Sequence, residues 1–480
     1  MNKLRANCLN FTELLAQNIA VISPTMTAAL IVPTMFGTTG SISWLSYAVG
    51  AVLVLFVALS LNQFAKRTTN SGSMYTYAMS GLGFGGGSLC GWCCLWAYLF
   101  IGLAGTTGFT IFASTLLGMV HIHLPAVLLF AFCLGSCFYI AYKDIKVSTL
   151  VTLGMEAFSC TFIMLLAFIV LGHHHFAIDT SQFNFKGTSM LTLGMGAVVA
   201  IFSLVGFESS TAFGEEAMNP LKTIPRSVIW SLVITASFFV FITYVEVMGT
   251  AGASTTLDKM DAPLNTLAAM YGVSFLQPIL SFGAMVSFFA LASSCMNAGA
   301  RVMYAMGRHD FFPQNTSYAH AKHGTPHVAL MVMAIVMFSV VTVSYYVLIG
   351  NGFALLDEFN DAGTMGAFGF VGAYTFIVLA APAFLKKRGE LKAGHVALCV
   401  VAMVLMLIPI VGSVWPVPSP PVNYFPYAFV AYLWFGILRV MGMRHQKPAR
   451  VEEISAEVRA QHAALGLAGG ETAAPVGAAA

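Results

Sequence analysis

Long apolar runs separated by short polar segments dominate the chain. A run of about 18 or more residues is long enough to cross the hydrocarbon core of a bilayer as a helix. Runs of this kind lie at residues 18–36, 42–64, 88–118, 124–142, 148–171, 190–213, 228–250, 274–300, 326–350, 362–385, 394–414 and 423–443. The pattern therefore predicts an all-α integral membrane protein with about 12 transmembrane helices.

Composition supports a membrane protein and excludes several other classes. Of the 480 residues, 58% are hydrophobic and only 9% are charged, which is more apolar surface than a soluble domain of this length can bury. The net charge of +3 is too small to indicate a nucleic-acid partner. Almost all of the nine cysteines lie within apolar runs, where cysteine usually acts as a small hydrophobic residue, so neither a metal site nor a disulfide is expected.

Basic residues give an independent test of the predicted helices. If the N-terminus is cytoplasmic and the twelve runs all cross the bilayer, 20 of the 22 Lys and Arg fall in cytoplasmic segments, and only Lys186 and Lys259 fall outside. This predicts a multi-pass protein of the plasma membrane with both termini in the cytoplasm. We expect a cytoplasmic lead at 1–17 that is not a signal peptide and a transporter-like domain at 18–443. The tail at 444–480 is expected to be disordered, although the sequence from about Glu452 is compatible with a short helix.

One apolar run contains an acid. Gly206 interrupts the run at 190–213 at about half the depth of a bilayer, and Glu208 follows two positions later. A carboxylate in the middle of a membrane helix costs about 2.5–3.5 kcal/mol on insertion scales, so a functional site is the usual reason to retain one. The following residues, 215–225, have the composition of a helix end and a loop.

The first apolar run also contains helix breakers. Pro24 and Pro33 bracket residues 25–29, and a proline inside a helix removes a backbone hydrogen bond. Breaks five spans apart in two halves of a chain indicate an inverted-repeat transporter with a site near the bilayer midplane. At such breaks, helix N-termini offer N–H groups to anions and exposed carbonyls can bind cations or ammonium groups.

Two long motifs resemble those of a known family. The stretch GFESSTAFGEEAMNPLKTIPRS at 206–227 and the stretch NAGARVMYAMGRHDFFP at 297–313 are similar to signatures of the amino acid–polyamine–organocation (APC) permeases. The resemblance implies a 5+5 inverted repeat, with helices 1–5 at about 18–171 and helices 6–10 at about 190–385, discontinuous helices 1 and 6, and two further helices at about 394–443. It also implies secondary transport of amino acids or related amines by alternating access, and no enzymatic activity or catalytic residues.

The same resemblance implies the residues of a substrate site. In the sixth helix these are Phe202, Ser203, Leu204, Val205, Gly206 and Phe207, with Phe202 in the position of an aromatic gate. In the first helix they are Thr25, Met26, Thr27 and Ala28. Many family members have Gly-Ser-Gly in the unwound part of the first helix, where backbone amides hold a substrate carboxylate. Here that place is held by Met26, Thr27 and Ala28, so the pocket is expected to be smaller or differently shaped.

The sequence leaves the coupling ion open. Some proton-driven relatives carry a Lys in helix five, but the run at 148–171 has none and contains Glu156 instead. Ser293 and Ser294 could offer hydroxyl oxygens to Na⁺, whereas Glu208 or Glu156 could exchange a proton, because a buried carboxylate can titrate near neutral pH. An exchanger that needs neither ion is also compatible. We therefore expect no cofactor beyond a possible coupling H⁺ or Na⁺.

Other functions remain as alternatives. A polyamine- or amine-specific antiporter and a non-transporting nutrient receptor would fit the same scaffold. A membrane enzyme would need paired catalytic groups at one depth, and a channel would favour a continuous polar stripe; the sequence has neither. Glu246, near the outer end of its run, is expected to reach water. The identity of the small-molecule substrate and the oligomeric state stay open.

Overall fold

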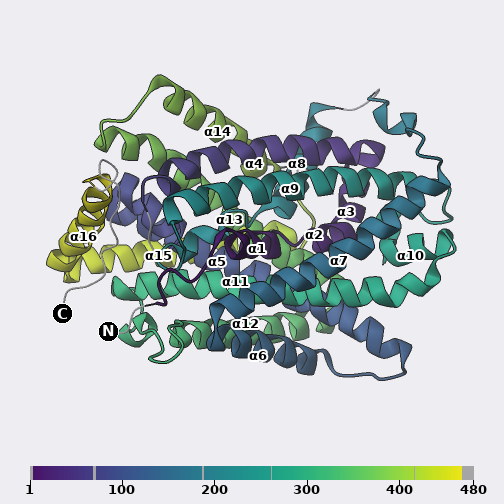
Figure 1. Ribbon diagram of the computed structural model, residues 1–480, viewed down its shortest axis with the longest axis horizontal. Helices are drawn as coiled ribbons and strands as arrows, with labels where there is room; N and C mark the ends of the chain where they lie inside the picture. The colour runs from purple at the N-terminus through teal and green to yellow at the C-terminus, as the bar shows by residue number, and fades with distance from the viewer. Residues whose placement is uncertain (1–3, 69–71, 186–188, 261, 416, 468–480) are drawn as a thin grey trace.

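The protein is a bundle of long helices (Figure 1). The computed structural model describes residues 4–68, 72–185, 189–260, 262–415 and 417–467. Its α-helices are α1 (Phe11–Ile22), α2 (Pro24–Met26), α3 (Val32–Thr39), α4 (Ser43–Ala65), α5 (Met74–Met119), α6 (Ala126–Lys143), α7 (Ile145–His173), α8 (Met190–Leu204), α9 (Pro220–Gly249), α10 (Pro263–Met270), α11 (Gln277–Arg308), α12 (His327–Gly350), α13 (Leu355–Lys387), α14 (Ala393–Gly412), α15 (Phe425–Gln446) and α16 (Pro448–Leu467).

Short 3-10 and π-helical turns join these helices. They are η1 (Thr27–Ile31), η2 (Gly40–Ile42), η3 (Thr180–Phe183), η4 (Ser209–Phe213), η5 (Leu257–Lys259), η6 (Ser274–Leu276), η7 (Gln314–Ser317) and η8 (Val422–Tyr424). Across the described residues, the β-pairing consists of a single isolated bridge between Leu9 and Ala217. The prediction of an all-α protein is confirmed.

Membrane-spanning segments follow the predicted runs closely. Among the described residues, 11 helical segments are long and apolar enough to cross a bilayer. The first of them, Phe11–Ala65, is 55 residues long and contains both of the first two predicted spans. The chain is therefore a multi-pass membrane protein. The sequence predicts about 12 spans and the described residues contain 11 segments, because Phe11–Ala65 counts as one segment but holds two predicted spans.

Helix α5 runs through the centre of the bundle. It extends over 46 residues with a kink at Gly83, whose backbone is not helical (φ +77°), and it packs mainly against α13 and α11. Gly369 lets α13 approach α5 closely, because a Cβ at this position would lie 2.6 Å from the backbone nitrogen of Ala97. Around this centre, α6 and α12 lie side by side along one edge of the view and α14 lies along the other (Figure 1). Of the broken helices, α1 packs mainly against α9, α7 and α11, and α8 packs mainly against α4, α14 and α3.

Both ends of the described chain lie at the same end of the bundle, which we call the terminal face (Figure 1). Ion pairs join the segments that meet there: Arg5 with Asp144 at 2.9 Å, Arg67 with Glu390 at 2.6 Å, and Arg308 with Glu457 at 3.5 Å. The sequence analysis assigned the basic residues of all these segments to the same side of the membrane. The structure thus places together the basic segments that hydropathy alternation predicted to share a side.

Two segments differ from the sequence prediction. The tail was expected to be disordered from residue 444, apart from a short possible helix from about Glu452. Instead, α15 continues to Gln446 and α16 begins at Pro448, with Ile454 and Val458 buried and α16 packed against α5 and α15. These apolar side chains on a helix surface gain a partner only in the folded bundle, which local composition does not reveal. Residues 468–480 of the predicted tail lie outside the described residues.

The segment read as a loop at 215–225 is the second difference. Asn219 has a left-handed backbone (φ 49°), and Pro220 is the first residue of α9. A proline suits this position because the first N–H groups of a helix have no intrahelical partner. Pro225 lies inside the helix, where its carbonyl accepts a hydrogen bond from Asn62 Nδ2 at 3.1 Å.

Candidate functional site

The first transmembrane helix is broken at Ser23. Helix α1 ends at Ile22, Ser23 has a left-handed backbone (φ 50°, ψ 77°), and helical structure resumes at Pro24. Proline cannot donate a backbone hydrogen bond and disfavours helical geometry in the residue before it, which explains the position of the break. The expectation that residues 26–28 form the unwound part was therefore wrong: these residues belong to α2 and the π-helical turn η1. Pro33 lies within the helical segment α3.

The sixth transmembrane helix is broken where the sequence predicted. Helix α8 ends at Leu204, Val205 is extended, and Gly206 has a φ of +102°, after which η4 begins. A Cβ on Gly206 would lie 2.4 Å from Cγ1 of Val21, the next-to-last residue of α1. The glycine is needed both for its backbone angle and for this close approach. The two breaks thus lie against each other in the interior of the bundle.

Most of the predicted substrate residues are buried around these breaks. Thr25, Met26, Thr27, Ala28, Ser203, Leu204, Val205, Gly206 and Phe207 are buried, and Phe202 is half-buried. Ser203 Oγ lies 3.2 Å from the hydroxyl of Tyr47 on α4. The ring of Phe202 packs on Gly363 of α13, where a Cβ would come within 2.0 Å of the ring.

Glu208 links the break in the sixth helix to two neighbouring helices. Its Oε2 accepts hydrogen bonds from the hydroxyl of Tyr374 on α13 at 2.7 Å and from the backbone N–H of Gly206 at 3.2 Å. Its Oε1 accepts one from the hydroxyl of Tyr98 on α5 at 3.2 Å. The carboxyl group is fully buried. It therefore fixes the non-helical backbone of the break to the centre of the bundle.

Glu156 on α7 does the same for the break in the first helix. Its Oε1 lies 3.0 Å from the backbone nitrogen and 3.0 Å from the hydroxyl oxygen of Thr25, and its Oε2 accepts a hydrogen bond from Ser287 on α11. The Thr25 hydroxyl also lies 2.8 Å from Ser159 Oγ, and Ser23 Oγ lies 3.1 Å from Ser287 Oγ. A polar cluster thus joins the break to α7 and α11.

Ser293 and Ser294 do not belong to the Glu156 cluster. They lie six and seven residues beyond Ser287 on α11, which is about 9–10 Å along a helix axis. Neither hydroxyl has a hydrogen-bond partner among the described residues. The carbonyl of Ser294 accepts a hydrogen bond from Gln17 Nε2 at 2.9 Å, which places these serines beside α1. The structure therefore separates the four residues proposed for coupling into three places.

Sequence reasoning missed the partners of both acids. Tyr98, Tyr374 and Ser287 lie far from the acids along the chain, and each sits in an apolar run where aromatic rings and hydroxyls usually serve packing. An aromatic hydroxyl buried in a membrane helix does need a partner. That requirement was the available signal, but it does not say which acid the hydroxyl would meet.

The exposure of Glu246 also differs from the prediction. It was expected to reach water, but it is fully buried on α9, one turn before the end of the helix at Gly249. Neither carboxyl oxygen has a hydrogen-bond partner among the described residues, and Tyr47 of α4 lies within electrostatic range. Asp179 and Gln182 bond Tyr244 at this end of α9, and α10 packs on the same helix, so position along the helix was a poor guide to exposure.

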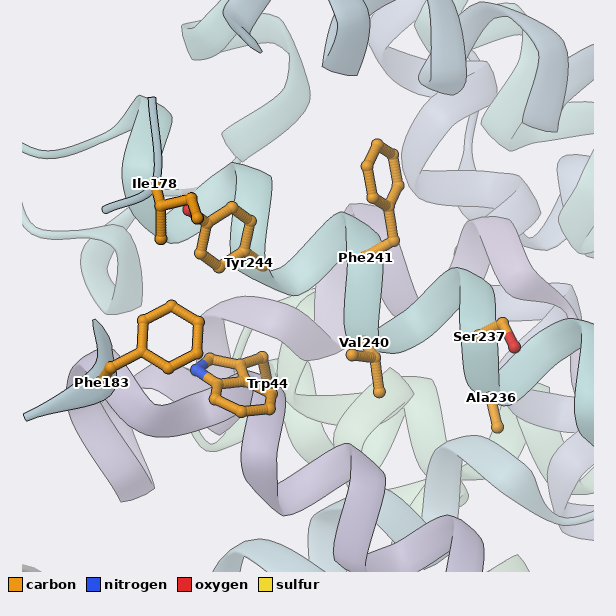
Figure 2. A pocket seen from close by; sticks show the side chains of 8 residues that line it. All are labelled: Trp44, Ile178, Phe183, Ala236, Ser237, Val240, Phe241 and Tyr244. Atoms are coloured by element: carbon orange, nitrogen blue, oxygen red, sulfur yellow. The ribbon is translucent and has the colours of Figure 1, made fainter. Parts of the chain in front are cut away.

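Two cavities accompany the bundle. One of about 330 Å³ lies between α3, α8, α13 and α14, and Phe202 forms part of its wall, together with polar groups of Thr34, Asn360 and Thr364. A second of about 650 Å³ lies between α4, α9 and the segment around η3. Figure 2 shows Trp44, Phe183 and Tyr244 gathered at one end of the second cavity, with Ala236 and Ser237 further along α9. Its described lining contains none of the predicted substrate residues, whereas the first cavity includes Phe202 and therefore adjoins the candidate site.

Comparison with known proteins identifies the family of this broken-helix bundle. Residues 14–455 match the family described as Amino acid permease. The chain belongs to that family. A branched-chain amino acid permease of Lactococcus lactis is 28% identical over 347 residues, which is 68% of this chain and 72% of that protein.

Other relatives extend the range of substrates in the family. A branched-chain amino acid permease of Bacillus subtilis is 26% identical over 306 residues, covering 59% of this chain and 64% of the relative. A low-affinity putrescine importer of Escherichia coli is 25% identical over 312 residues, covering 62% of this chain and 68% of the relative. The chain thus spans about two thirds of the length of these curated relatives, and the similarity covers both amino acid permeases and an amine importer.

Both motifs that indicated this amino acid permease family meet at the terminal face. Arg301 of α11 is fully buried and donates two hydrogen bonds to the fully buried carboxylate of Glu216, at 2.5 and 2.8 Å. Its guanidinium also lies 4.2 Å from the ring centroid of Phe213. The motif at 206–227 is therefore tied to the motif at 297–313 by a buried ion pair.

The N-terminal segment completes this contact. The backbone N–H groups of Cys8 and Leu9 donate to the carbonyl of Glu216 at 2.8 and 3.0 Å, and the N–H of Met218 donates to the carbonyl of Leu9 at 2.7 Å. In this permease the terminal face is closed beneath the two breaks, because α1, η4 and α11 are joined there.

Proposed function

We propose that this protein is a secondary transporter of amino acids or related amines that works by alternating access around the two broken helices. The observation that carries the proposal is the contact of the two breaks at Val21 and Gly206 in the buried interior of the bundle. Backbone groups that leave a helix inside a membrane protein are tolerated only where they meet protein or line a cavity. Their function in such a fold is to bind a ligand near the midplane.

The substrate is proposed to bind between residues 25–28 and residues 202–207. Phe202 suits the role of a gate, because its ring lies in the wall of the 330 Å³ cavity and packs on Gly363 of another helix. A cavity of this size accommodates a small amino acid or diamine, since ligand sites begin at about 300 Å³. Opening of the site towards this cavity requires the ring of Phe202 to move away from Gly363.

The conformational change is proposed to involve the terminal face. Gln17 of α1 donates to Ser209 of η4 and to the carbonyl of Ser294, and Arg301 holds Glu216, so both broken helices are fastened to α11. Access from the terminal face requires these contacts to separate. Glu208 and Glu156 are proposed to order the breaks during this movement, through their bonds to α5, α13 and α11.

Coupling to H⁺ or Na⁺, or exchange for a second substrate, is proposed as the driving force. Glu208 and Glu156 are candidates for proton transfer, and Ser293 and Ser294 are candidates for cation binding because their buried hydroxyls have no partner among the described residues. We also propose that the terminal face is cytoplasmic in the plasma membrane, since the basic residues that follow the positive-inside rule gather there.

Uptake into proteoliposomes tests the proposal. A panel of labelled amino acids and polyamines is offered while the sodium gradient and the pH gradient are varied separately. Saturable uptake of at least one compound is expected, with a response to one gradient or to preloaded substrate. The absence of saturable uptake and exchange for the whole panel would refute the transporter assignment.

A further inference from the structure

The amide groups at the start of the outer half of the first helix are already bound. Pro24 has no N–H, the N–H of Thr25 donates to Glu156 Oε1 at 3.0 Å, and the N–H of Met26 donates to the carbonyl of Ser23 at 2.9 Å. The N–H of Thr27 donates to the carbonyl of Pro24. A half-helix N-terminus is where a transporter of this kind would hold a substrate carboxylate. Here a carboxyl group of the protein itself occupies that place.

The same break leaves carbonyl groups without their helical partners. In a continuous helix, the carbonyls of Ala20, Val21 and Ile22 would accept from residues 24, 25 and 26. Those residues donate elsewhere or cannot donate, as the preceding contacts show. Carbonyls at a helix C-terminus carry partial negative charge and can accept hydrogen bonds from a cationic ligand. The first break therefore offers carbonyl acceptors, and its first turn has no free backbone N–H, although the Thr27 hydroxyl is buried without a partner among the described residues.

The break in the sixth helix repeats this arrangement. The N–H of Gly206 donates to Glu208 Oε2 instead of to the carbonyl of Phe202, its helical acceptor. Further along, the N–H of Ser209 donates to the carbonyl of Gly206, and the N–H of Ser210 donates to Asn18 Oδ1 at 2.6 Å. A second internal carboxyl group thus engages an amide of the second break.

An unpartnered acceptor beside the breaks gives an independent indication of the ligand. Gln17 is 1% exposed, and its amide nitrogen donates to Ser209 and to the carbonyl of Ser294. Its Oε1 has no donor among the described residues. A buried acceptor left without a donor costs about 1–3 kcal/mol, so a ligand that brings donors would relieve this cost.

The charged side chains at the breaks also favour a cationic ligand. The described residues of α1, α2, η1, α8 and η4 include no Lys, Arg or His, whereas Glu156 and Glu208 contact the two breaks directly. Arg301, the buried arginine on α11, is engaged by Glu216 at the terminal face. A substrate carboxylate would find no basic partner on these broken-helix elements.

We propose that the substrate of this transporter is an amine that carries no carboxylate, held through its ammonium group by the carbonyls of the two breaks and Gln17 Oε1. The inference rests on the proposed transport function and specifies its substrate class. Glu156 takes the place of the carboxylate that an amino acid would bring. A carboxylated substrate is disfavoured because its anion would be buried without a basic partner, and because the amides of Thr25 and Gly206 already bond carboxyl groups of the protein.

Pairs of compounds that differ only by decarboxylation test the inference. Purified protein is offered putrescine and ornithine, cadaverine and lysine, isoamylamine and leucine, and phenethylamine and phenylalanine. Binding is measured by the ligand-dependent shift in thermal unfolding, and transport by uptake into proteoliposomes. Within at least one pair, the amine is expected to bind about 100-fold more tightly than the amino acid, because the carboxylate would be buried without a basic partner.

Substitution of Glu156 links the preference to the residue. Glu156→Leu frees the Thr25 amide, so the preference for the amine is expected to fall by about tenfold or more. Glu156→Gln keeps an oxygen that can accept from Thr25 and should keep the amine preferred. Glu358→Gln is the matched control: it removes another buried carboxylate, one that bonds Ser344 and contacts neither break, and should leave the ratio unchanged.

The possible results distinguish a failure of the amine assignment from a failure of the proposed transport function. Uptake of the amino acid members with no response to the amines would overturn the amine assignment and uphold the transporter. Equal affinity for both members of every pair would also overturn it. If neither member of any pair binds or is transported, the proposed function itself fails. The wild-type panel decides these outcomes even if Glu156→Leu does not fold.

Discussion

Glu216→Gln is expected to loosen the terminal face. In the wild type, Glu216 and Arg301 are both fully buried, and two hydrogen bonds join their charged groups. The carbonyl of the same residue holds the backbone of Cys8 and Leu9. Glutamine keeps the size of the side chain but leaves the buried guanidinium of Arg301 without a counter-charge. The closed arrangement should therefore become less stable, while any state in which Arg301 reaches water is unaffected.

The size of the effect follows from the burial of the pair. Removing one partner of a buried ion pair costs about 3–5 kcal/mol, because the remaining charge is uncompensated. If the cost falls on the closed conformation alone, the ratio of open to closed molecules rises by about 150- to 4,000-fold. A shift of this size is large enough to change the accessibility of the N-terminal segment at equilibrium.

Cys8 reports the change without an engineered label. Burial, followed by the nearby carboxylate of Glu216, raises the pKa of the Cys8 thiol from 9.0 to about 11. At pH 8 only about 0.1% of such a thiol is ionised, against about 9% for a thiol with the ordinary pKa. Alkylation of Cys8 by N-ethylmaleimide should therefore accelerate in Glu216→Gln, by up to about 100-fold if the thiol becomes fully exposed.

The measurement is peptide mass spectrometry of the alkylated protein over time. Cysteines in the core, such as Cys94 and Cys295, are buried and should stay unmodified, which distinguishes local opening from unfolding. Glu215→Gln is the control, because Glu215 bonds Arg308 at 3.1 Å with both side chains about one-third exposed. An exposed pair contributes about 0–1 kcal/mol, so Cys8 should react at nearly the wild-type rate in that variant.

Equal alkylation rates in the wild type and in Glu216→Gln would refute the reasoning. Such a result would mean that the buried pair does not hold the N-terminal segment against α11. Fast alkylation of Cys8 in both Glu216→Gln and the control Glu215→Gln would also refute the reasoning. It would show that the loss of any nearby negative charge exposes Cys8, whether or not the ion pair is buried.

Three further predictions concern the breaks and the terminal face. Gly206→Ala should reduce uptake at least about tenfold, because its φ of +102° and the contact with Val21 leave no room for a Cβ; normal uptake would show that the two breaks need not touch. Glu208→Gln should slow uptake driven by a pH gradient more than substrate binding, since each of three hydrogen bonds weakens by about 1 kcal/mol, and unchanged pH dependence would remove Glu208 from coupling. Burial lowers the pKa of His309 from 6.5 to about 4. The folded state therefore pays no cost for keeping this imidazole neutral above pH 6.5, and the free energy of unfolding falls by up to about 3 kcal/mol as the pH is lowered towards 4. His309→Asn should flatten the fall in thermal stability between pH 6.5 and 4, and an unchanged slope would exclude His309 as its source.

Hydropathy alone determined the class of the protein and most of its helices. The width of a bilayer fixes how long an apolar run must be, and this requirement is local, so α4, α6 and α12 lie close to the predicted runs at 42–64, 124–142 and 326–350. Proline and glycine at Pro24 and Gly206 indicated the two breaks for the same reason, since their backbone restrictions act within a few residues.

Tertiary packing decided what each polar group meets. A membrane helix that is apolar on all sides gives no sign of which face turns inward. Glu156 therefore could not be paired with Thr25, 131 residues away, and Glu208 could not be paired with Tyr374, 166 residues away. The burial of Glu246 depends in the same way on elements from elsewhere in the chain, such as α4 and α10, that pack on α9.

The stretch around Gly206 shows where the two kinds of information divide. From the sequence alone, an acid two residues after a glycine in an apolar run indicates a site, because a carboxylate is costly in a membrane. Only the folded structure shows that this acid and Glu156 each engage an amide of a break. Hydrogen bonds are satisfied by whichever group lies within about 3 Å in space, and the order of residues along the chain does not contain that distance.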